Sequence, residues 1–227
     1  MNVITAEKLN FDSELVGAMV LRDADAFPIT ERTTVVNLAQ TDAYVGTTQL
    51  SPLPPLSSTV LVSGTVSGEL LLALTVADEV GQEQRARALG WLDFYGADGP
   101  VLLKSQQDTV GTVTIDRRAV LHQPVLPSNP ERFTVKANLW FSPAGTDCGI
   151  HNLHPFIEVH TQVTGLGRMQ KFDDKRHDAL YEDQLLSPGT TNPIPFCIDV
   201  DGEFTYPWHQ YRADTDCIWL ALEYHAI

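Results

Sequence analysis

The sequence predicts an all-β protein, either a sandwich or a barrel. Short runs rich in β-branched and aromatic residues recur along the 227 residues, glycine and proline turns separate them, and one segment has weak helical features. The clearest strand is 133–141, FTVKANLWF, where every second side chain is apolar and points to one face. The segment 217–224, CIWLALEY, is almost continuously apolar, which predicts a central strand.

The N-terminal region, residues 1–125, also favours strands. We expect a strand over 33–38, and a linker or an extended edge over 50–58, because three prolines in LSPLPPLSS remove backbone donors. Residues 58–76 predict a hairpin or a pair of strands around two glycines. The best helix candidate is 77–89, although a glycine weakens it.

The middle of the chain predicts further strands and a break. Residues 91–103 indicate a strand, a Gly-Ala-Asp-Gly turn and a second strand, and 112–121 indicate one more strand. The proline-rich segment 122–132 is typical of a domain boundary. We therefore divide the chain into a β-rich region, 1–125, and a second domain, 126–227.

Composition excludes some classes of partner. The formal net charge of -14 disfavours nucleic acid and anionic membranes, which bind basic surfaces, and leaves a small-molecule substrate open. Three cysteines without a CxxC pair indicate reduced thiols and a cytoplasmic protein. The start lacks the features of a signal peptide, and no apolar run approaches the ~20 residues that span a bilayer.

The segment 145–167, GTDCGIHNLHPFIEVHTQVTGLG, concentrates groups that bind metals or move protons. In one uninterrupted strand His154 and Glu158 would lie about 13 Å apart, too far to share a metal whose ligands lie at ~2.0–2.2 Å. A turn between them is therefore required, and Pro155 favours one. On the following strand Glu158, His160 and Gln162 share a face, and we expect a hairpin at 164–167.

This segment resembles the first motif of the cupin superfamily. That motif has a glycine, five residues, His-x-His, three or four residues, Glu, six residues and Gly. Here Gly145 is followed by five residues and His151, and His154 by three residues and Glu158, with six more before Gly165. The chain has His-Asn-Leu-His where the family has His-x-His. Either a β-bulge turns His151 toward the site, or Asn152 takes its position and His151 points away.

The second cupin motif is matched only in part, by Gly202, Pro207 and His209. The resemblance implies a divalent metal ion, with Fe(II) favoured and Mn, Ni or Zn as alternatives. It also implies four ligands, His151, His154, Glu158 and His209.

The resemblance implies roles for other side chains as well. Glu158 or His160 is the expected proton carrier, although a structural hydrogen bond explains His160 equally well. The expected substrate contacts are Gln162, Arg168 and Trp208, with a surface position as the alternative for Arg168. We interpret the remaining histidines, His122, His177 and His225, as core or surface residues.

The resemblance implies a cupin-type double-stranded β-helix, a jelly-roll barrel, in residues 126–227. The N-terminal region is then a degenerate second cupin or a set of extra strands. The implied function is a metal-dependent enzyme, foremost a non-haem iron oxygenase acting on a small polar metabolite. A cupin isomerase or epimerase and a non-enzymatic small-molecule-binding cupin are the alternatives. Cupins commonly dimerise, so we expect a homodimer.

Overall fold

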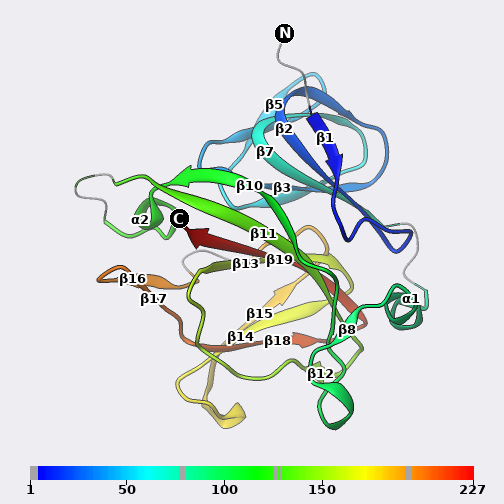
Figure 1. Cartoon of the computed structure of the whole chain (residues 1–227), viewed down its shortest axis with the longest axis vertical. Helices are drawn as coiled ribbons and strands as arrows, with labels where there is room; N and C mark the ends of the chain where they lie inside the picture. Colours follow the sequence, from blue (N-terminus) through cyan, green and yellow to red (C-terminus); the bar gives the residue numbers. More distant parts are fainter. Residues whose placement is uncertain (1–4, 77–79, 125–126, 128, 193–195) are drawn as a thin grey trace.

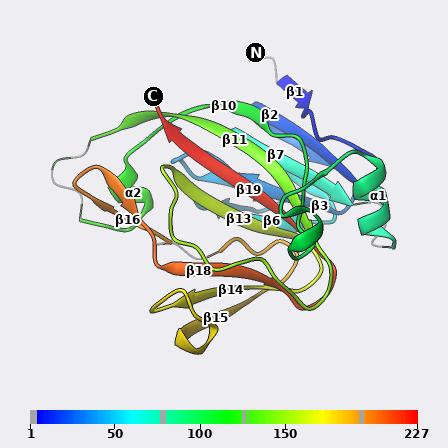
Figure 2. The same cartoon turned by 60° about the horizontal axis from the view of Figure 1, so that its bottom comes forward.

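The computed structural model describes residues 5–76, 80–124, 127, 129–192 and 196–227. Figures 1 and 2 show three antiparallel sheets in layers: a seven-stranded N-terminal sheet, a six-stranded middle sheet and a four-stranded sheet beyond it. The all-β prediction is confirmed. Within the described residues, no helix is both long and apolar enough to cross a membrane.

The N-terminal sheet has the order β1-β2-β7-β3-β6, with β4 pairing with β5 and β7. Its strands are β1 (Thr5–Lys8), β2 (Val16–Ile29), β3 (Thr33–Asn37), β4 (Ala43–Gly46), β5 (Leu50–Leu53), β6 (Ser58–Leu61) and β7 (Gly64–Val76). The predicted strand at 33–38 is confirmed as β3. The proline-rich segment forms an extended edge, because β5 pairs only with β4.

The hairpin alternative for 58–76 is wrong, and the alternative of two separate strands is right. Strands β6 and β7 both pair with β3 and not with each other. Gly68 lies inside β7, where an added Cβ would meet the Cβ of Ala43 and Cδ2 of Leu71 at 3.0 Å each. This glycine therefore serves close packing and not a turn.

The middle sheet has the order β13-β19-β11-β9-β8, and β10 also pairs with β11. Its strands are β8 (Leu92–Asp93), β9 (Leu103–Lys104), β10 (Asp108–Ile115), β11 (Glu131–Ser142), β13 (Ile157–Thr164) and β19 (Cys217–Ala226). The prediction of a central C-terminal strand is confirmed, because β19 lies between β13 and β11. The strand, turn and strand predicted for 91–103 are present as β8, a 3-10 turn and β9.

Short helices interrupt the strands: α1 (Gln82–Ala88), α2 (Arg117–Val120) and the 3-10 turns η1 (Gly96–Asp98) and η2 (His177–Ala179). The helix predicted for 77–89 is present as α1, and its first residues, 77–79, lie outside the described residues. The single strand predicted for 112–121 is wrong beyond Ile115. Asp116 caps α2 there, because its side chain accepts hydrogen bonds from two backbone N–H groups of that helix.

Strands from both sides of the predicted domain boundary at residue 125 belong to one sheet. Strands β8, β9 and β10 precede that boundary and pair with each other or with β11, in the same sheet as β13 and β19. One hydrophobic cluster also joins buried residues of β2 and β7 to those of β11 and β19. The division into 1–125 and 126–227 stays a prediction.

The four-stranded sheet has the order β12-β18-β14-β15. Its strands are β12 (Thr146–Asp147), β14 (Gly167–Phe172), β15 (Leu180–Leu186) and β18 (Trp208–Ala213), and a separate hairpin joins β16 (Ile198–Val200) to β17 (Glu203–Thr205). The hairpin predicted at 164–167 is wrong, since β13 pairs with β19 while β14 pairs with β15 and β18. The chain crosses between sheets at Gly165, whose φ is +74°.

The two faces of the middle sheet have different neighbours. The alternating face predicted on β11 is confirmed, because all its side chains are fully buried: Phe133, Val135, Ala137, Leu139 and Phe141. The N-terminal layer covers this side of the sheet, where the Tyr224 hydroxyl of β19 donates to the Leu38 carbonyl at 3.2 Å. The opposite face of the sheet carries Glu158 and His160 of β13, and the histidine cluster lies on that side, with His209 on β18.

Candidate metal centre

A cluster of three imidazoles and one carboxylate lies between the middle and four-stranded sheets. His151, His154, Glu158 and His209 each offer one ligand atom, and these atoms all lie within 4.8 Å of one another. Glu158 is the second residue of β13, His209 belongs to β18, and the other two histidines lie in the preceding loop. The chain bends at Pro155, as the sequence predicts, and this bend returns Glu158 to His154.

Backbone pairing positions His151. Its N–H donates to the His209 carbonyl, and its carbonyl accepts from the His209 N–H, both at 2.9 Å, which forms an isolated antiparallel bridge. The two rings lie 4.4 Å apart, and the His154 ring lies 4.9 Å from that of His151. Of the two alternatives left open by the extra residue, the structure has His151 facing the cluster.

Hydrogen bonds orient two of the imidazoles. Nδ1 of His151 lies 2.9 Å from the Gly149 carbonyl, and Nδ1 of His209 lies 2.8 Å from the Pro207 carbonyl. Because a carbonyl only accepts, each Nδ1 carries the proton and each Nε2 presents a lone pair. Nε2 of His209 lies 3.3 Å from Nε2 of His154, which in turn lies 3.5 Å from Oε2 of Glu158.

The electrostatics of the cluster suit a cation. Burial lowers the pKa of His209 to about 3 and also lowers the pKa of His154, so both imidazoles are neutral near pH 7. Burial raises the pKa of Glu158, but the neighbouring histidines, His160 foremost, outweigh this effect and lower the pKa to about 2. Neutral imidazoles beside a carboxylate are the protonation states that bind a divalent metal ion. The residues present therefore fit such an ion.

His160 lies next to the cluster. Its Nε2 is 3.3 Å from Oε1 of Glu158, and its ring stacks on Tyr211 of β18 with centroids 4.1 Å apart and planes 8° from parallel. The backbone N–H of His160 donates to Oδ1 of Asn192 at 2.5 Å. Within the described part of the chain, both ring nitrogens of His160 and the Tyr211 hydroxyl are buried without a hydrogen-bond partner, and Nε2 makes only the 3.3 Å contact with Glu158.

A cavity of about 700 Å³ opens onto the cluster. His151, His154, Glu158 and His160 line its inner part. Aromatic, basic and acidic side chains from other elements complete much of its wall: Phe94, Tyr95, Lys104, Trp140, Phe156, Lys175, Tyr211, Trp219 and Glu223. These nine were not singled out from the sequence as site residues, because their positions depend on strand pairing. Glu223, for example, lies opposite Glu158 in the β13–β19 register.

The three expected substrate contacts lie elsewhere. The Gln162 amide is fully buried and donates to the Thr164 carbonyl at 2.6 Å. Arg168 bonds to Asp214 and Asp183 at 2.7 and 2.8 Å. Gln162, Arg168 and Trp208 are all absent from the described lining of the cavity.

The other histidines and the cysteines lie outside the four-residue cluster. Nε2 of His225 pairs with Glu223 at 2.8 Å, and its ring packs on Phe156 with centroids 4.6 Å apart. His177 belongs to η2 and is exposed. The three cysteines are buried and unpaired. Burial raises the pKa of Cys148 to about 12, which keeps this thiol at the cavity wall protonated.

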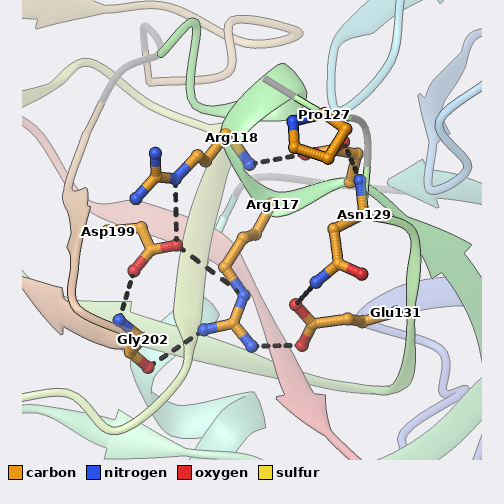
Figure 3. Close-up of a pocket in the computed structure, with 8 residues that line it drawn as sticks. Arg117, Arg118, Pro127, Asn129, Glu131, Asp199 and Gly202 are labelled. Carbon is orange, nitrogen blue, oxygen red and sulfur yellow. Dashed lines mark hydrogen bonds and ion pairs between the residues drawn. The ribbon is translucent and has the colours of Figure 1, made fainter. Parts of the chain in front are cut away.

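A second cavity, of about 510 Å³, lies between α2 and the β16–β17 turn (Figure 3). The Arg117 guanidinium at its centre donates to the Gly202 carbonyl at 2.9 Å and to the Glu131 carboxylate. Asp199 lies 4.0 Å from Arg117 and 3.7 Å from Arg118. The opposite charges in this cavity pair with one another, so we interpret it as an ion-pair network that joins elements of the fold.

Known proteins were compared with the chain. No protein-family profile and no curated protein sequence matches it. Among solved structures, a DMSP lyase is 20% identical over 40% of this chain and 38% of its own, with a TM-score of 0.27. Ectoine synthase from P. lautus is 17% identical over 39% and 52%, with a TM-score of 0.27. Bacillus subtilis oxalate decarboxylase, a protein with Mn(II) centres, is 12% identical over 95% and 70%, with a TM-score of 0.30.

These matched structures are cupin-fold proteins. The matched part spans about half or less of the DMSP lyase and the ectoine synthase. Superpositions with TM-scores this low do not transfer an activity, so the chemistry of this chain is inferred from its own geometry.

Proposed function

We propose that the chain is a cupin-type metal-dependent enzyme in which His151, His154, Glu158 and His209 hold one divalent metal ion. The observation that carries this proposal is the convergence of four ligand atoms within 4.8 Å of one another. Four protein ligands leave coordination positions open on a six-coordinate ion, and the cavity is lined by three of the four, His151, His154 and Glu158.

The composition of the ligand set narrows the choice of metal ion. Three imidazoles and one carboxylate suit Fe(II), Mn(II), Ni(II) or Zn(II), and none of the four ligands is a thiolate that would select a softer ion. Iron is our favoured ion and a non-haem oxygenase our favoured reaction class, with an isomerase or epimerase as the alternative. When bound, the metal supplies a Lewis acid and a site for oxygen or substrate ligation.

The chain's own residues supply the remaining functions. Glu158 presents Oε2 to His154 and Oε1 to His160, so one carboxylate connects the ligand set to a further imidazole. We infer that Nε2 of His160 carries the ring proton and faces Oε1 of Glu158. His160 is then the nearest group beside the cluster that is able to give or take a proton. The Tyr211 ring holds the His160 ring in a stacked orientation.

Metal analysis tests this function. Protein purified without a histidine tag and dialysed against each of the four ions should retain about one ion per chain, and His154→Ala should lower the affinity at least 100-fold. His177→Ala is the matched control, because His177 is an exposed histidine outside the cluster, and it should retain the metal.

Retention below about 0.1 ion per chain with every metal, or equal loss in both variants, would contradict the proposed site. Oxygen uptake by the iron-loaded protein with candidate substrates then separates an oxygenase from an isomerase. The homodimer and the cytoplasmic location stay predictions.

A further inference from the structure

The outer part of the cavity has a wall of aromatic rings. Phe94 packs edge-on against Trp140 and Tyr95, with centroids 5.3 and 5.0 Å apart. The Tyr95 hydroxyl donates to the Cys148 carbonyl at 2.7 Å, which ties the aromatic segment to the loop that leads to His151. Because this hydrogen bond holds the segment in place, the wall is formed before any ligand arrives, and it offers flat apolar surface.

The inner part of the cavity has polar groups whose bonding capacity is unused. Three buried atoms here have no hydrogen-bond partner among the described residues: the Tyr211 hydroxyl oxygen, Nδ1 of His160 and Nε1 of Trp219. Native proteins satisfy almost all buried polar groups, so several orphans lining one cavity indicate a ligand that is missing from the bonding scheme. Tyr211 and Trp219 are hydrogen-bond donors, and they require an oxygen acceptor.

The basic side chains of the wall favour a negative charge. Lys104 places Nζ 4.8 Å above the Trp140 ring, and neither Lys104 nor Lys175 forms an ion pair within the described part of the chain. By contrast, Glu223 is already engaged by His225 and by the Gln107 amide, both at 2.8 Å. The Glu223 carboxylate thus already has hydrogen-bond donors, whereas the two lysine ammonium groups remain available at the wall and complement an acid.

We propose that the substrate of this site is an aryl or otherwise planar, conjugated carboxylic acid. Its acidic end lies at the metal cluster and accepts a hydrogen bond from Tyr211, and its apolar body packs on Phe94 and Trp140. This inference rests on the proposed function for the metal, and it replaces the small polar metabolite expected from the sequence. A two-carbon acid would fill only a small part of the 700 Å³ cavity and leave the aromatic wall in water.

The test uses 1-hydroxy-2-naphthoate, a fluorescent aryl hydroxy acid, with oxalate and glycolate as short competitors. Binding to the metal-loaded protein is measured by fluorescence titration, and the metal content of each sample is measured in parallel. We expect the naphthoate to bind at least tenfold more tightly than either short acid. Oxalate or glycolate binding as tightly as the naphthoate would overturn the inference while leaving the metal site in place.

Three variants locate the binding. Phe94→Ala should weaken naphthoate binding about tenfold with little risk to folding, since Phe94 is 54% exposed. Tyr211→Phe should weaken it about fivefold without changing the metal content, because only the unpartnered hydroxyl is removed. Tyr181→Phe is the matched control, because this exposed tyrosine lies on β15 outside the cavity, and it should bind as the parent does. Unchanged binding in both Phe94→Ala and Tyr211→Phe would overturn the inference.

The outcomes separate the two proposals. A chain that holds no metal contradicts the proposed function, and the same titration on the metal-free protein then decides the ligand class alone. Naphthoate binding that is lost in Phe94→Ala supports the aryl acid, and absence of binding overturns it.

Discussion

Two cavities of the described structure, one beside α2 and one beside the histidine cluster, are similar in size and opposite in chemistry. The cavity beside α2, of about 510 Å³, contains Arg117, Arg118, Glu131 and Asp199, whose opposite charges face each other. The histidine cavity, of about 700 Å³, is lined by polar atoms that lack partners among the described residues. Charged residues in a hollow therefore do not by themselves indicate a site. Several unpartnered polar atoms lining one cavity do, whereas the described lining of the cavity beside α2 leaves only one buried side-chain atom without a hydrogen bond, Nε of Arg117, and that atom lies 4.0 Å from Asp199.

In the cavity beside α2, here called the paired cavity, the charged side chains have partners within the fold. Arg117 lies over the rings of Phe133 and Phe204, with its guanidinium carbon 5.8 and 5.1 Å from their centroids. Its hydrogen bonds reach Glu131 on β11 and Gly202 in the β16–β17 turn, as Figure 3 shows. One arginine thus connects α2, the middle sheet and the small hairpin, and its charge is compensated within the fold.

The largest expected effect is on stability in the paired cavity. Arg117→Ala removes the partner of Glu131 and Asp199 and should lower the free energy of unfolding by about 3 kcal/mol, because breaking a buried ion pair leaves a charge uncompensated. Urea unfolding measures this change. Arg118→Ala is the control: its side chain is 48% exposed, so its loss should cost less than about 1 kcal/mol. Equal losses of unfolding free energy in the two variants would contradict the view that Arg117 forms a buried ion pair and Arg118 an exposed one.

The second-largest expected effect is stabilisation by a bound metal ion, which should depend only on residues of the histidine cavity. A bound metal stabilises the folded state by about 2.7 kcal/mol when its concentration is 100 times the dissociation constant. We expect this gain for the parent protein and also for Arg117→Ala, measured as the rise in unfolding free energy on adding metal. Glu158→Gln should lose most of the gain, because it removes the anionic ligand. A gain that also vanished in Arg117→Ala would mean that the two cavities are coupled.

The smallest expected effect is on the unfolding free energy when either of two buried tyrosines near the histidine cluster loses its hydroxyl. The Tyr206 hydroxyl donates to the Phe156 carbonyl at 2.8 Å and accepts from the Glu158 N–H at 2.7 Å, so Tyr206→Phe should cost about 1–2 kcal/mol. The Tyr211 hydroxyl has no hydrogen-bond partner among the residues that the structure describes, so Tyr211→Phe should change the unfolding free energy by less than about 0.5 kcal/mol. Both values are measured by urea unfolding without ligand. A cost for Tyr211→Phe as large as that for Tyr206→Phe would show that its hydroxyl is already satisfied.

Sequence patterns predicted the local features of the site and missed those that depend on pairing. The bend at Pro155 and the shared face of Glu158, His160 and Gln162 on β13 follow from the chemistry of neighbouring residues, and both are present, the second in the register with β19. The orientation of His151 could not be decided from spacing, because a bridge to His209, 58 residues further on, settles it. The hairpin expected at 164–167 is wrong for a similar reason: local glycines indicate a turn but not the sheet to which the chain returns.

By itself the sequence determined the all-β class, the apolar face of β11, the central position of β19 and a histidine-rich segment with cupin-like spacing. Only the tertiary structure decided which strands face each other. It brought Tyr211 against His160, placed Lys104 and Trp140 at the cavity wall, and compensated the charge of Arg117. The physical reason is that side-chain direction along a strand has a period of two residues, whereas the partner of that strand is chosen by contacts far apart in sequence.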